Sequence, residues 1–165
     1  MSPRSKSDAL DKLRRLRHDR EKLAAETLGR ERAVLDAAEA RERQAEADRA
    51  AYEQHRASQE ARLYAAALER PAHVDALERL GDRVSELAAG SRRQEAAVRE
   101  RRAETGRAEA ETDAARETWR QRRRDADRLD RLAERRGLAR RKAAEVRDDL
   151  AAEDEASLMP TRGRS

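Results

Sequence analysis

The sequence predicts an all-α protein in which two long helices form an antiparallel coiled-coil hairpin, with the second helix longer than the first. Charged residues make up 45% of the chain and aromatic residues 2%, so large apolar side chains are too few for the core of a compact domain. The bias toward Ala, Arg, Glu and Leu favours helix. The chain has only three prolines, which leaves two long stretches without a strong helix breaker.

Pro71 separates these two stretches and predicts the position of the turn. A proline disfavours helix at the residue before it and suits the first turn of a new helix. We therefore expect a short connection, which forces the two helices to lie antiparallel. The expected segments are a disordered start (1–7), a first long helix (8–69), a turn (70–72), a second long helix (73–156) and a disordered tail (157–165).

A second break at Gly90 would instead give three helices and a compact bundle. The heptad pattern argues against it, because counting in sevens from Leu77 passes through Val84, Ser91 and Val98 without a shift of register. We therefore predict that the second helix is continuous and that its apolar stripe forms the coiled-coil seam. The seam residues include Leu77, Leu80, Val84, Leu87, Val98 and Trp119.

The residue types argue against an enzyme. The chain has no cysteine and no Gly-rich phosphate loop, and its three histidines have no companion at metal-ligand spacing. We therefore expect no catalytic residues, no metal and no cofactor. No stretch resembles a signal peptide or approaches the roughly 20 apolar residues of a membrane span, so a cytoplasmic location is expected.

The charges are nearly balanced overall but are segregated in the second half of the chain. Residues 119–142 contain eleven Lys or Arg against four acids, whereas residues 145–155 contain six acids against Arg147. These blocks indicate either a solvated helix face or an electrostatic contact with an oppositely charged ring or groove. Nucleic acid is a weaker alternative for residues 119–142, since acids are interleaved and aromatic residues that could stack on bases are scarce.

The stretch "YEQHRASQEARLYAAAL" (52–68) holds both tyrosines of the chain, just before the predicted turn. Tyr52, His55, Gln59 and Leu63 can share one helical face. They could pack against the start of the second helix, or they could form a partner-binding surface, as concentrated aromatic and Arg residues suggest.

At these residues the chain resembles the YscO type of type III secretion protein, a relative of the flagellar export protein FliJ. The resemblance rests on "YEQHRASQEARLY" ahead of a Pro-containing turn, followed by "VDALERLGDRVSELAAG". A second similar stretch is "ARETWRQRRRDADRLDRL", with its Trp and basic run. His55 departs from the pattern, because the family is expected to carry Trp there.

The resemblance implies a non-catalytic central stalk of a type III secretion export apparatus, at the cytoplasmic side of the inner membrane. Its terminal end would enter the hexameric export ATPase, and its turn end would approach the cytoplasmic domain of the export gate protein and possible secretion chaperones. The implied ATPase-end residues are Leu10, Leu13, Leu16, Leu23, Leu129, Leu132, Val146 and Leu150. The implied gate-end residues are Tyr52, His55, Arg56, Leu63 and Tyr64.

Two other functions remain open from the residues alone. One is a homodimeric coiled-coil scaffold or adaptor, because Ala, Arg and Glu coiled coils of different function have similar sequences. The other is a basic coiled coil that binds nucleic acid through residues 119–142. Neither alternative involves a small-molecule substrate.

Overall fold

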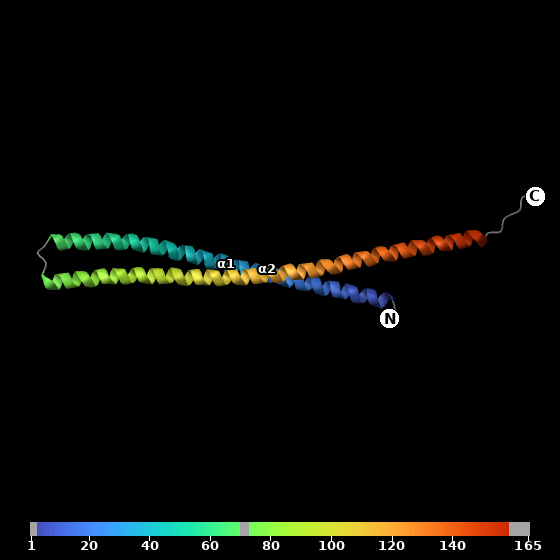
Figure 1. The fold of residues 1–165 in the computed structure, drawn as a ribbon, viewed down its shortest axis with the longest axis horizontal. Helices are drawn as coiled ribbons and strands as arrows, with labels where there is room; N and C mark the ends of the chain where they lie inside the picture. Colours follow the sequence, from blue (N-terminus) through green and yellow to red (C-terminus); the bar gives the residue numbers. More distant parts are fainter. Residues whose placement is uncertain (1–2, 70–72, 159–165) are drawn as a thin grey trace, which may run out of the picture. The chain divides into compact units, whose positions relative to one another are not determined.

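The protein consists of two long α-helices in a computed structural model that describes residues 3–69 and 73–158. Helix α1 spans Pro3–Leu68 with 66 residues, and helix α2 spans Val74–Leu158 with 85 residues. The described residues contain no strand. The predicted all-α fold, with a longer second helix packed against the first, is therefore confirmed (Figure 1).

The helix ends differ slightly from the predicted ones. Helix α1 begins at Pro3, before the predicted start at residue 8, and proline is tolerated there because the first N–H groups of a helix have no intrahelical partner. At the start of α2, the carbonyl of His73 accepts the N–H groups of Ala76 (2.9 Å) and Leu77 (3.2 Å). The predicted turn (70–72) and the tail from residue 159 onward lie outside the described residues.

Helix α2 is continuous through Gly90, so the three-helix alternative is wrong. No glycine in the described part of the chain has a positive φ, which is the conformation that commonly ends a helix. Helix α1 likewise continues through Gly29. The unbroken heptad register correctly predicted this continuity, because a true break would have allowed the register to shift.

The chain divides into two compact units, each containing a segment of both helices. One unit comprises residues 26–117, where Figure 1 shows α1 and α2 side by side. Its interhelical contacts include Tyr52 with Leu87, Glu46 with Arg102, and Glu31 with Thr112. The partner in α2 moves toward the C-terminus as the residue in α1 moves toward the N-terminus, so the two segments are antiparallel.

The other unit comprises residues 1–25 and 118–165. Its helical segments are joined by ion pairs, of which Arg14 with Asp130 (2.9 Å) and Arg17 with Asp125 (3.2 Å) are the shortest between Arg and Asp. The order of these pairs again makes the two segments antiparallel. From residue 138 to residue 157, every side chain of α2 is exposed except the half-buried Ala144.

Most of the buried residues are small, and most lie on the predicted seam. On α2 they include Ser91, Val98, Thr105, Ala108, Thr112 and Ala126, and on α1 they are Leu28 and Ala38. Thr112, only 1% exposed, donates a hydrogen bond from Oγ1 to the carbonyl of Glu31 (3.2 Å). No buried side-chain N or O atom among the described residues lacks a partner. Small seam residues let the helices approach closely but bury little apolar area per residue.

The other named seam residues are less buried than Val98. Leu80, Val84, Leu87 and Trp119 are half-buried. Leu77 is 52% exposed, because it lies in the first turn of α2, beside the end of α1, where fewer neighbours are available. The ring of Trp119 also stacks with the guanidinium of Arg123, whose Cζ lies 5.4 Å from the ring centroid.

Candidate partner-binding sites

The first candidate surface is the aromatic stretch of α1 in the unit of residues 26–117. Tyr52 is half-buried and donates its hydroxyl proton to the carbonyl of Leu87 (3.1 Å). The ring of His55 lies 6.2 Å from the ring of Tyr52, at an interplanar angle of 50°. Tyr52 therefore joins the two helices, and the exposed His55 extends its aromatic surface outward.

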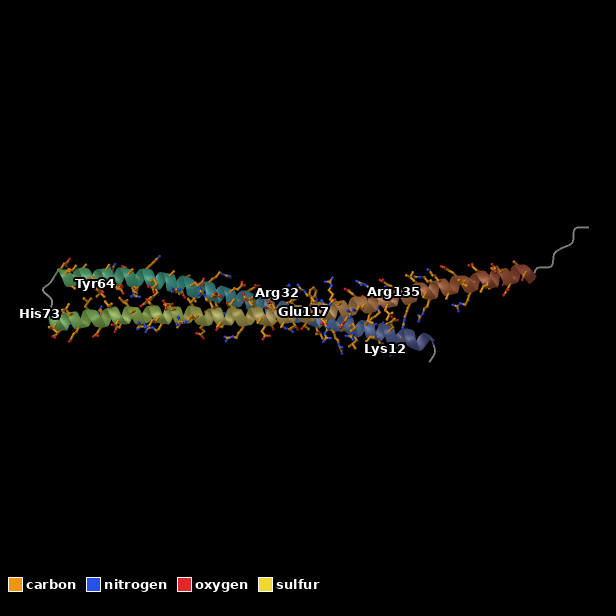
Figure 2. All side chains as sticks on the ribbon, viewed as in Figure 1. Lys12, Arg32, Tyr64, His73, Glu117 and Arg135 are labelled. Carbon is orange, nitrogen blue, oxygen red and sulfur yellow. The ribbon has the colours of Figure 1, made fainter. Side chains whose placement is uncertain are left out.

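Arg56 holds the same part of α1 against α2. It donates from Nη1 to Ser91 Oγ (3.0 Å) and from Nε to Glu60 Oε1 (2.7 Å). The hydrogen bond to Glu60 raises the pKa of the Arg56 guanidinium. Leu63 is half-buried, whereas Tyr64 is 49% exposed. The five predicted residues thus divide into an anchoring set, Tyr52, Arg56 and Leu63, and an exposed set, His55 and Tyr64. Figure 2 labels Tyr64, near the end of α1.

A groove runs beside the anchoring residues. Its walls carry apolar, amide and charged groups from both helices, a mixture that suits a protein partner better than a small molecule. The residues that line it are Tyr52, His55, Gln59, Leu63, Arg83, Glu86, Leu87 and Arg93. Sequence reasoning missed the charged wall formed by Arg83, Glu86 and Arg93, because nothing in α2 alone shows which of its charges face Tyr52.

Gly90 allows the close approach of Tyr52. A Cβ added at Gly90 would overlap the Tyr52 hydroxyl and Cζ and would lie 3.0 Å from Cε1. No such neighbour lies within 4 Å of a Cβ added at Gly29, Gly81 or Gly106. Sequence reasoning treated Gly90 only as a possible helix break, whereas its role is to admit the tyrosine ring.

The second candidate surface lies in the unit formed by residues 1–25 and 118–165. Several of its large apolar side chains are exposed, including Leu13 (40%), Leu16 (45%) and Leu132 (41%). Leu10 and Leu129 are half-buried, and Leu13 and Leu129 line a shallow depression with Arg17, Asp125 and Arg128. Leu23, Val146 and Leu150 are each more than half exposed.

Ion pairs between the helices flank these leucines. The carboxylate of Asp130 accepts from Arg14 Nε (2.9 Å) and contacts His18 Nε2 (3.1 Å). These hydrogen bonds, that of Arg14 first, lower the pKa of Asp130 below its usual value. Two of the four acids within residues 119–142, Asp125 and Asp130, therefore pair with α1, and this unit combines ionic interhelical contacts with exposed apolar residues.

The described residues contain neither a membrane-spanning helix nor a metal site. Neither of the two helices, as far as they are described, is apolar enough over a sufficient length to cross a membrane. Within residues 3–69 and 73–158, no group of three or more His, Cys, Asp or Glu side chains is arranged to hold a metal ion.

Comparison with known proteins identifies one family and one shared fold. The family model described as type III secretion protein YscO matches residues 10–158. Among solved structures, CT670 from Chlamydia trachomatis, described as a candidate YscO homolog, matches with a TM-score of 0.72 and 20% sequence identity, over 90% of each chain. The likeness to CT670 shows a shared fold. No curated protein matches the chain.

Proposed function

Because the chain belongs to the YscO family of type III secretion proteins, we propose that it is the central stalk of the export apparatus. In this role it links the hexameric export ATPase to the cytoplasmic domain of the export gate protein, on the cytoplasmic side of the inner membrane. It performs no chemistry itself, and secretion chaperones that have released their cargo bind it as well.

The observation that carries this proposal is the exposure of large apolar side chains in the unit of residues 1–25 and 118–165. Leu16 and Leu132 are 45% and 41% exposed, so the free chain leaves a large part of their apolar surface uncovered. Exposed apolar residues bordered by charged ones are typical of protein-binding surfaces. In the proposal, Leu10, Leu13, Leu16, Leu23, Leu129, Leu132, Val146 and Leu150 enter the ATPase ring.

The ATPase contact is tested with the purified cognate enzyme. The wild-type chain should increase ATP hydrolysis or ring assembly, and the double variant Leu16→Asp/Leu132→Asp should lose this effect. Val34→Asp is the matched control, because Val34 is 50% exposed but lies in the other unit, so it should behave as the wild type. An ATPase that responds equally to all three chains would contradict the proposed contact.

The gate contact is assigned to His55 and Tyr64, with Tyr52, Arg56 and Leu63 holding the surface in place. Tyr64→Ala removes an exposed ring without disturbing the Tyr52–Leu87 contact, so it should weaken binding to the cytoplasmic domain of the gate, measured by calorimetry. Tyr64→Phe keeps the ring and should bind nearly as well as the wild type. Equal affinity of Tyr64→Ala and wild type would refute this assignment.

A further inference from the structure

The C-terminal part of α2 carries two blocks of equal and opposite charge. Residues 131–142 contain six basic residues and Glu134, and residues 145–155 contain six acidic residues and Arg147. Each block therefore has five excess charges, positive in the first and negative in the second. Nearly every side chain in this part of α2 is exposed. The segment is the orange to red part of the ribbon in Figure 1.

The two blocks cannot neutralise each other within one chain, except at their boundary. Both lie on the continuous helix α2, and at 1.5 Å per residue Arg136 and Glu153 are roughly 26 Å apart along its axis. This separation exceeds the screening length of about 8–10 Å near physiological salt. A second helix running in the opposite direction would bring each block against its complement.

An apolar stripe runs along the same part of the helix. Ala139, Ala143, Val146 and Leu150 are spaced by four, three and four residues, which places them on one helical face. All four are exposed, Val146 by 56% and Leu150 by 54%. The stripe provides a narrow surface against which another helix can pack.

We propose that this part of α2 pairs antiparallel with the same segment of a second copy of the chain, the basic block of each copy facing the acidic block of the other. In one antiparallel register, Ala143 faces Val146 and Ala139 faces Leu150, so a small residue meets a larger one in each layer. The same register sets Arg136 against Glu153. The self-complementarity of charge and the fit of the stripe select a second copy as the occupant of this surface.

The proposed pairing does not depend on the proposed stalk function, but the pairing would affect binding to the ATPase ring. Val146 and Leu150 belong to the surface assigned to the ATPase ring, so a dimer would cover residues that the ring must contact. Ring binding and self-association should therefore compete. Away from the ring, the dimer would shield this apolar stripe from contact with unrelated proteins.

The first test is sedimentation equilibrium of the full chain at several protein concentrations. The dissociation constant of the dimer should rise at least about tenfold between about 50 mM and 500 mM salt, because opposite exposed charges are screened. A monomer at all concentrations in low salt would overturn the proposal, and so would a dimer whose affinity does not change with salt.

The second test uses two charge-reversal variants. One replaces the basic block's arginines with Glu (Arg135→Glu, Arg136→Glu, Arg140→Glu, Arg141→Glu), and the other replaces acids with Lys (Asp148→Lys, Asp149→Lys, Glu153→Lys, Asp154→Lys). Each variant alone should be monomeric, because both of its blocks have the same sign. An equimolar mixture should restore dimers, whereas a mixture that stays monomeric, with both variants fully helical by circular dichroism, would overturn the pairing.

The third test keeps the wild-type charges and so does not depend on the folding of those variants. The chain has no cysteine, so a nitroxide label on Ala144→Cys reports only this position. Electron spin resonance should detect a short distance between labels, since residue 144 lies next to the two-fold axis. A label on Ser58→Cys, in the other unit, is the control. A short distance at Ser58→Cys and none at Ala144→Cys would show a different dimer and refute the proposed one.

Discussion

Substituting Gly90 by alanine tests the contact between Tyr52 and α2 directly. Alanine favours helix over glycine by about 0.8–1.0 kcal/mol, so the substitution would stabilise α2 if nothing lay near the new methyl group. At Gly90, however, the new Cβ would overlap the Tyr52 hydroxyl and Cζ. Because the Tyr52 hydroxyl is hydrogen-bonded to Leu87, the ring can withdraw only by giving up that bond. Overpacking of this kind costs about 1–3 kcal/mol.

Gly106→Ala is the matched control, because Gly106 is exposed, lies in the same helix and unit, and has no neighbour within 4 Å of the added Cβ. The gain in helix propensity is common to both variants and cancels in their comparison. We therefore expect Gly90→Ala to be less stable than Gly106→Ala by about 1–3 kcal/mol in free energy of unfolding. The measurement is urea unfolding followed by circular dichroism at 222 nm.

A double variant identifies the cause of the difference. In a Tyr52→Ala background the obstructing ring is absent, so Gly90→Ala should become stabilising, as Gly106→Ala is. If Gly90→Ala and Gly106→Ala stabilise the wild-type chain equally, Tyr52 does not pack against Gly90 and the assignment of Tyr52 as an anchor is wrong.

Three further predictions concern the contacts between the helices. Asp130→Asn should remove the contribution of the Asp130 carboxylate to the free energy of unfolding. In the wild type this contribution is fully present above the unfolded pKa of about 3.9 and is lost as the pH falls through the lower folded pKa. In urea unfolding, acid should therefore lower the free energy of unfolding less in the variant than in the wild type. Val98→Ala, at a site 2% exposed, should lower the free energy of unfolding by about 1–2 kcal/mol, whereas Val34→Ala, 50% exposed, should change it by less than about 0.5 kcal/mol. Arg102→Gln should lower the melting temperature in low salt and have little effect in high salt, because the Arg102 side chain is exposed to solvent where it pairs with two glutamates of α1.

The fold was predictable from the sequence because two long stretches without proline predict two long helices and a heptad row predicts the seam of α2. The heptad row from Leu77 to Trp119 includes four of the buried residues of α2, namely Ser91, Val98, Thr105 and Thr112. The low aromatic content and the positions of the prolines sufficed to exclude a compact core.

The contacts between the two helices were not predictable in the same way. The face of α1 that meets α2 includes charged residues such as Arg14, Arg17 and Arg56, each with an acidic or hydroxyl partner across the pair. Such partners depend on the stagger of one helix against the other, which neither helix specifies alone. The groove wall of Arg83, Glu86 and Arg93 and the role of Gly90 both follow from this stagger, so the structure was needed to find them.

The composition of the seam also determines how the binding surfaces can be studied. Its buried residues are mostly Ala, Ser and Thr, each of which contributes little by burial, so the pairing depends on many weak contacts distributed along both helices. Leu16 and Leu132 are exposed, and substitutions at exposed positions usually change stability by no more than about 0.5 kcal/mol. A variant at either leucine that loses partner binding should therefore keep its helical content, which separates the loss of binding from a loss of folding.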